Sequence, residues 1–178
     1  MSKKSWKTSL CETLERRLQV YRLPRVAVVG IGHTLCGDDA AGVVLAEALQ
    51  LELEGCEHVL VVAAGPVPEN YSGLLRRFCP DLVLLVDAAN MDETPGIVGW
   101  LEWQETTGNS TSTHSLPLRL FAQYLTLELG CEVALLGIQP SQNDIGCPVS
   151  PVVLKALQST AHIITATLKD RKVLHDHQ

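Results

Sequence analysis

Residues 25–31 read Arg25-Val26-Ala27-Val28-Val29-Gly30-Ile31. This short, almost unbroken apolar run is typical of a strand that is buried on both faces of a parallel sheet. A glycine-rich turn follows, and we expect a helix from Asp38 to Glu52. A buried strand, a tight turn and a helix together indicate the first unit of an α/β fold.

The same alternation continues along the 178 residues. We expect further strands at 58–63, 82–86, 98–103 and 132–138, and further helices at 68–78, 114–129 and from Pro151 onward, with Ser150 as the N-cap of the last helix. The connection 88–97 contains Pro95-Gly96 and is too short for a helical crossover, so the strand at 98–103 should run antiparallel. The sequence therefore predicts a mainly parallel sheet covered by helices on both faces.

The first 22 residues differ in pattern from the rest. Trp6, Leu10, Leu14 and Leu18 recur at every fourth position, which predicts an amphipathic helix over residues 5–20. Such a helix either docks onto the domain or binds a partner. We expect an N-terminal helical extension at 1–22 and one domain at 23–178, because the chain length is ordinary for a single domain.

Composition excludes several classes of function. The net charge of -6 without a basic stripe argues against nucleic acid as a partner. Apolar runs such as 82–86 are far shorter than the roughly 20 residues of a membrane span, and Glu12 and Glu15 interrupt any apolar core of a signal peptide. The six cysteines form no Cys-x-x-Cys pair, which favours buried thiols in a reducing compartment. We expect a cytoplasmic protein with no membrane partner.

Acidic residues follow two of the predicted strands. Asp38 and Asp39 come after the glycine turn, and Asp87 ends the strand at 82–86. Ligands of open α/β sheets bind beyond the carboxyl ends of the strands, so Asp39 and Asp87 would face one crevice if their strands are neighbours. The alternatives are helix capping for Asp38 and Asp39, and turn formation for Asp87.

Two histidines could complete a cation site. His114 lies at the end of a Ser/Thr-rich segment and at the start of a predicted helix, and His33 lies within the glycine turn. Two carboxylates and one imidazole would leave coordination positions open for a reacting group. The turn does not have the G-x-G-x-x-G spacing of a dinucleotide site, and its carboxylates would repel phosphate, which leaves a nucleotide-binding enzyme as the weaker alternative. The residues alone predict a cation-binding α/β domain and do not define a reaction.

Several motifs occur in the order found in hydrogenase maturation endopeptidases, and residues 26–153 resemble that family. The matching segments are Gly30-Ile31-Gly32-His33-Thr34-Leu35-Cys36-Gly37-Asp38-Asp39-Ala40-Ala41-Gly42, Leu84-Leu85-Val86-Asp87-Ala88 and Ser112-Thr113-His114-Ser115-Leu116-Pro117-Leu118. Pro68-Glu69-Asn70 and Leu136-Gly137-Ile138-Gln139-Pro140 are similar to the branch that serves formate-hydrogenlyase-type hydrogenases. The resemblance implies a three-layer α/β/α fold around a five-stranded mixed, mostly parallel sheet.

The resemblance also implies a site and a substrate. Asp39, Asp87 and His114 would be the catalytic, metal-contacting residues, with Asp38 and His33 as supporting residues. The enzyme would be a nickel-dependent endopeptidase that removes the C-terminal extension of a nickel-iron hydrogenase large-subunit precursor after nickel insertion. The nickel would arrive in the precursor, and the protease would act as a monomer.

Two positions depart from the family pattern. His33 stands where the family usually has asparagine, and Ala63-Ala64-Gly65 stands where Asp-Gly-Gly is common. These departures suggest an alternative function, a nickel-responsive chaperone that binds the same precursor without cleaving it.

Overall fold

The computed structural model describes residues 4–18, 22–101, 103 and 115–169. The sheet has five strands, β1 (Val26–Ile31), β2 (Val59–Gly65), β3 (Leu82–Ala88), β4 (Val98–Leu101) and β5 (Glu132–Ile138), in the order β2-β1-β3-β5-β4. β1 pairs in parallel with β2 and with β3, and β3 pairs in parallel with β5, whereas β4 is antiparallel to β5. The predicted mixed, mostly parallel sheet is confirmed, including the antiparallel strand after Pro95-Gly96.

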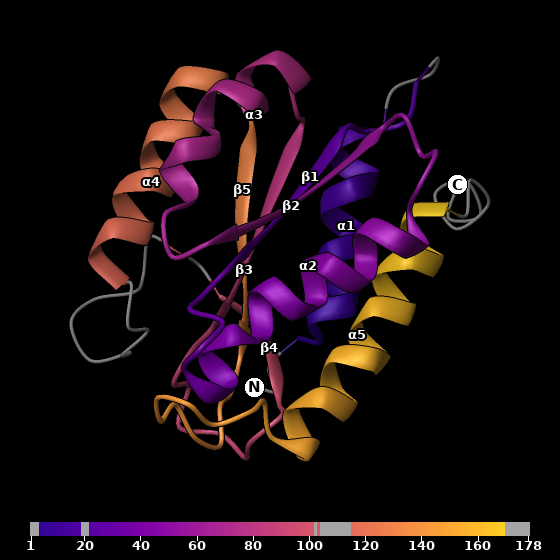
Figure 1. Ribbon diagram of the computed structural model, residues 1–178. Coiled ribbons are helices and arrows are strands. Elements are labelled where there is room, and N and C mark those ends of the chain that lie inside the picture. Colours follow the sequence, from indigo (N-terminus) through magenta and orange to yellow (C-terminus); the bar gives the residue numbers. More distant parts are fainter. Residues whose placement is uncertain (1–3, 19–21, 102, 104–114, 170–178) are drawn as a thin grey trace.

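Helices cover both faces of this sheet (Figure 1). They are α1 (Trp6–Arg17), α2 (Ala41–Glu52), α3 (Ser72–Phe78), α4 (Ser115–Leu129) and α5 (Pro151–Lys169), with short 3-10 turns η1 (Gly37–Ala40) and η2 (Pro68–Tyr71) before α2 and α3. One buried cluster joins α1, α2 and α5 to the sheet, and a second joins α3 and α4 to its other face. Alternate residues of each central strand enter opposite clusters, because successive side chains of a strand point to opposite faces.

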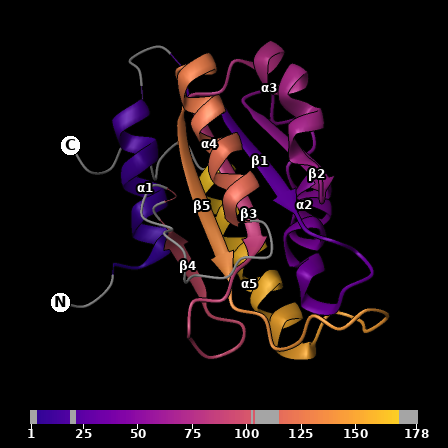
Figure 2. The same cartoon turned by 90° about the vertical axis from the view of Figure 1, so that its left-hand side faces the viewer.

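The N-terminal helix docks onto the domain, as one of the two interpretations predicts. Leu10 and Leu14 are buried in the cluster that α2 and α5 also line. Arg16 and Arg17 both form ion pairs with Glu132 at the start of β5. Figure 2 shows α1 beside β4 and β5. α1 is therefore part of the packed domain, since detaching it from the sheet would expose its two buried leucines and the core residues that they cover.

Two expected helices begin later than predicted. Residues 38–40 and 68–71 form 3-10 turns, so the α-helices start at Ala41 and Ser72. The backbone N–H of Asp38 donates to Gln142 O at 2.8 Å, and that of Asp39 donates to Cys36 O at 3.0 Å. These bonds hold the two residues in a tight turn before the α-helix begins. Along the described residues, none of the helices has the length and apolar character that crossing a bilayer requires.

Candidate functional site

The predicted site lies where the parallel strands end. Gly30 of β1 pairs with Val86 of β3, so the turn after β1 and Asp87 lie at the same edge of the sheet. α2, α4 and α5 all begin at this edge, which is the lower end of the molecule in Figure 2. Helix N-termini carry partial positive charge, and ligands of α/β sheets bind at such an edge. β1 and β3 are neighbours, which meets the condition under which Asp39 and Asp87 would lie at one end of the fold.

α2 packs against this edge through a close backbone contact. A Cβ atom on Gly42 would lie 2.2 Å from Val86 O and 2.4 Å from Ile31 O, and one on Gly30 would lie 2.1 Å from Gly42 O. No side chain fits at either position unless the helix moves away from the strands. Asp39 is three residues before Gly42, so this contact also fixes the distance of Asp39 from the strand ends.

Asp39 is buried and held by the turn that precedes it. Its Oδ2 atom accepts a hydrogen bond from the backbone N–H of His33 at 2.8 Å. Gly32 has φ +134, and a Cβ there would lie 1.8 Å from Asp39 O, so the turn requires glycine. Neither η1 nor α2 has a side-chain cap, which argues against helix capping as the role of Asp39.

His33 supports this turn in two ways. Its backbone N–H reaches Asp39, and its ring Nδ1 accepts a hydrogen bond from the backbone N–H of Leu35 at 3.3 Å. A side-chain acceptor that bonds the amide two residues later is the arrangement of an Asx turn. The imidazole thus does what an asparagine side chain would do at this position, and its contact with Asp39 runs through the backbone.

Asp87 is fully buried near the end of β3. Val83 and Leu85 enter the cluster that α3 and α4 line, so the alternation of side chains places Asp87 on the same face of the sheet as α4. Burying a carboxylate is costly unless it is hydrogen-bonded, paired or bound to a cation. Two buried acids at one edge therefore form a strongly electronegative site.

The third predicted ligand, His114, lies outside the described residues. α4 begins at the next residue, Ser115, on the face that Asp87 occupies. Among the residues that the structure describes, no three His, Cys, Asp or Glu side chains gather closely enough to hold a metal ion. The donor set of two carboxylates and one imidazole suits a divalent transition metal, and the metal site with His114 stays a prediction.

Asp38 has a different environment from its neighbour. Its Oδ1 accepts a hydrogen bond from Ser150 N at 2.6 Å, and its Oδ2 accepts bonds from Ser141 N at 2.7 Å, Gln142 N at 3.1 Å and Ser150 Oγ at 2.9 Å. The carboxylate is completely buried. The sequence suggests a helix cap for Asp38, but its side chain instead binds Ser150. Ser150 still precedes α5, and its backbone O accepts a hydrogen bond from Leu154 N at 2.9 Å, as an N-cap residue does. Asp38 therefore anchors the connection between β5 and α5 beside Asp39.

This connection, residues 139–150, is the part of the site that the sequence did not reveal. Besides the bonds to Asp38, Gly146 N donates to Leu35 O at 2.7 Å and Gly37 N donates to Cys147 O at 3.1 Å. The turn after β1 and the connection after β5 thus form one hydrogen-bonded unit. The Gln139-Pro140 motif and Ser150 were visible in the sequence, but their contact with Asp38 was not.

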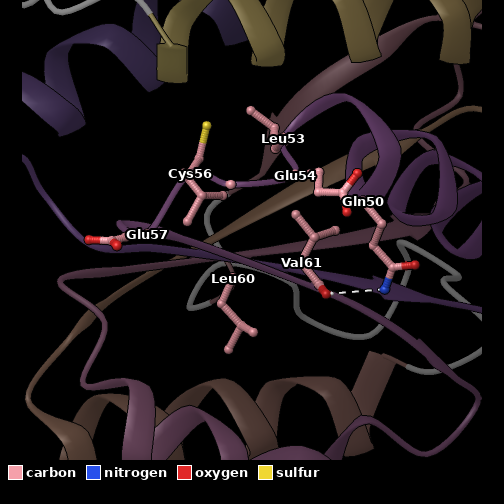
Figure 3. Close-up of a pocket in the computed structure, with 9 residues that line it drawn as sticks. Gln50, Leu53, Glu54, Cys56, Glu57, Leu60 and Val61 are labelled. Carbon is pink, nitrogen blue, oxygen red and sulfur yellow. Dashed lines mark hydrogen bonds between the residues drawn. The ribbon is translucent and has the colours of Figure 1, made fainter.

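The hollow drawn in Figure 3 lies at the other end of α2, away from the two acids. Gln50, Leu53 and Cys56 line it, and Gln50 Nε2 donates to Val61 O at 3.2 Å. It contains no buried acid. In the core, burial raises the pKa of the Cys131 thiol to about 11, which argues against a reactive thiolate at that residue.

Comparisons with known proteins agree on one family. The family model described as hydrogenase maturation protease matches residues 43–167. A putative hydrogenase maturation protease of Methanocaldococcus jannaschii is 33% identical over 72% of this chain and 79% of its own length. The hydrogenase 3 maturation protease of Escherichia coli K12 is 30% identical over 72% of this chain and 81% of its own length. The crystal structure of a NiFe hydrogenase maturation protease from Thermococcus kodakarensis aligns with a TM-score of 0.78 at 33% identity, covering 88% of this chain and 99% of that one.

Proposed function

The chain belongs to the hydrogenase maturation protease family, and we propose that it removes the C-terminal extension of a nickel-iron hydrogenase large-subunit precursor after nickel insertion. The observation that carries this proposal is the pair of buried acids, Asp39 and Asp87, at the carboxyl ends of neighbouring strands. The motifs at 68–70 and 136–140 support the formate-hydrogenlyase-type branch as the source of the precursor.

In this proposal the nickel belongs to the substrate. Asp39, Asp87 and His114 add oxygen and nitrogen ligands to a nickel ion that the precursor already holds. One contact then verifies that the metal has been inserted and also positions the scissile peptide, which lowers the entropic part of the barrier. The protease itself would work as a cytoplasmic monomer and would contain little metal when isolated.

The test compares nickel-loaded with nickel-free precursor, each mixed with metal-stripped protease after removal of free metal. Mass spectrometry of the precursor's C-terminus reports cleavage. We expect cleavage of the loaded precursor only, and equal cleavage of both would refute substrate-borne nickel as the trigger.

Substitutions test the site separately. Asp39→Asn, Asp87→Asn and His114→Gln should each abolish cleavage of the loaded precursor. Asp144→Asn is the matched control, because Asp144 is an exposed acid in the nearby 139–150 connection and should not be needed. Normal cleavage by any two of the three site variants would contradict the assignment.

The second candidate is a nickel-responsive chaperone that binds the precursor and leaves it intact. Ala63 favours it, because this residue pairs with Gly30 beside the site where the family pattern has an acid. An unchanged precursor mass, together with stable binding of the loaded precursor, would decide for the chaperone.

A further inference from the structure

Two loops at the carboxyl edge carry exposed aliphatic side chains. Leu35, in the turn after β1, is 63% exposed, and Ile145, in the connection after β5, is 85% exposed. The bond from Gly146 N to Leu35 O, at 2.7 Å, brings the two loops together next to these side chains. Both loops appear at the lower right of Figure 2, beyond the strand ends.

The two loops are held firmly. Asp38, buried between them, accepts four hydrogen bonds from residues of the 141–150 segment, and Gly37 N adds a bond to Cys147 O. Charge-assisted bonds to a buried carboxylate are the strong kind. Leu35 and Ile145 therefore stay exposed although their backbones are fixed, and neither side chain folds back into the core.

A third exposed aliphatic residue lies on the neighbouring loop. Val67 follows β2, and Gly65 O of that strand accepts a hydrogen bond from Gly32 N at 3.2 Å. Single exposed aliphatic residues are ordinary, but a group on adjoining loops marks a surface that contacts another protein.

We infer that Leu35, Ile145 and Val67 form the docking surface for an apolar patch of the large-subunit precursor. This inference rests on the proposed function. The turn that exposes Leu35 also holds Asp39, through His33 N and Cys36 O. A precursor that brings its scissile peptide to Asp39 would therefore lie against this turn, where a second copy of the chain would compete with it.

The test introduces charge on the docking surface. In cleavage of nickel-loaded precursor, Leu35→Asp and Ile145→Asp should each raise KM about tenfold, as expected for aliphatic anchors of an interface, while kcat stays within about twofold. Leu51→Asp and Leu127→Asp are matched controls. Their side chains are 80% and 74% exposed, but they lie in the last turns of α2 and α4, at the opposite end of the molecule. The controls should keep the wild-type KM.

Thermal unfolding of every variant checks that the fold is intact, and titration of uncleaved precursor measures docking without catalysis. A double variant, Leu35→Asp with Ile145→Asp, that binds and cleaves the precursor like the wild type would overturn the docking surface. A wild-type chain that binds the precursor but never cleaves it would instead refute the proteolytic function. In that case the docking surface would still stand if the double variant binds the precursor at least tenfold more weakly than the wild type does. Loss of self-association with an unchanged KM would identify a second copy as the occupant and overturn the inference.

Discussion

Replacing Asp38 by asparagine tests whether this residue anchors the site. Its carboxylate accepts four hydrogen bonds, three at Oδ2 and one at Oδ1. An asparagine of the same shape keeps one oxygen and gains an NH₂ group. If that oxygen keeps the place of Oδ2, the NH₂ group faces Ser150 N, which lies 2.6 Å from the present Oδ1. Two N–H donors, one from the new asparagine side chain and one from Ser150, would then face each other. The three bonds at the retained oxygen would no longer be made to a charged carboxylate.

The cost follows from the burial of this network. Hydrogen bonds to charged groups contribute about 1.5–3 kcal/mol each, and a buried donor left without its acceptor costs about 1–3 kcal/mol more. We therefore expect Asp38→Asn to lower the free energy of unfolding by about 3–5 kcal/mol, a large part of the roughly 5–15 kcal/mol of a typical domain. Ser150→Ala removes only the hydroxyl bond, and its expected cost is about 1–2 kcal/mol.

Urea unfolding followed by circular dichroism measures these differences, and Asp144→Asn serves as the control for an acid-to-amide change on the surface. That control should change the free energy of unfolding by less than about 0.5 kcal/mol. The folded fraction of Asp38→Asn should also cleave the precursor more slowly, because the 139–150 connection loses its anchor beside Asp39. An Asp38→Asn protein within about 1 kcal/mol of the wild type would refute the anchoring role.

Other substitutions test the packing around the site and the core. Gly42→Ala should push α2 away from the strand ends. We expect a lower temperature of thermal unfolding and less cleavage, the latter measured by the mass of the precursor. Leu14→Ala should cost about 2–5 kcal/mol in urea unfolding, since the side chain is buried in the core, and deletion of residues 1–22 should cost more. Cys36→Ser should retain cleavage; an inactive, folded protein would give that thiol a functional role. Arg22 holds the pKa of Asp81 below its usual range, so Asp81→Asn should lower the free energy of unfolding at pH 7. The difference in free energy of unfolding between this variant and the wild type should shrink below about pH 4, where the wild-type carboxylate becomes protonated.

Much of the fold could be predicted because its strands are buried on both faces. β1 and β3 are almost entirely apolar, and every residue of both is buried. The sequence left their adjacency open, and the observed pairing of β1 with β3 places Asp39 and Asp87 at one edge. The starts of α2 and α3 were wrong by a few residues, because backbone bonds to distant or preceding residues hold 3-10 turns there.

The environment of Asp38 could not be predicted from local pattern. Its main partner, Ser150, is 112 residues away in the chain. An acid before a helix normally favours capping, so the local pattern gives no hint of this distant partner. Only the tertiary fold shows that these two side chains bind each other. The contribution of His114 stays a prediction, because this residue lies outside the described part of the chain.

The bond between Asp38 and Ser150 also bears on how the protein is made. A ribosome releases the chain from its N-terminus, and domains begin to fold during synthesis. All four donors to the Asp38 carboxylate come from residues 141–150. A nascent chain that ends at β3 has both Asp39 and Asp87 but lacks every donor to the Asp38 carboxylate. The edge that carries the two acids is therefore completed only when the last fifth of the chain has emerged.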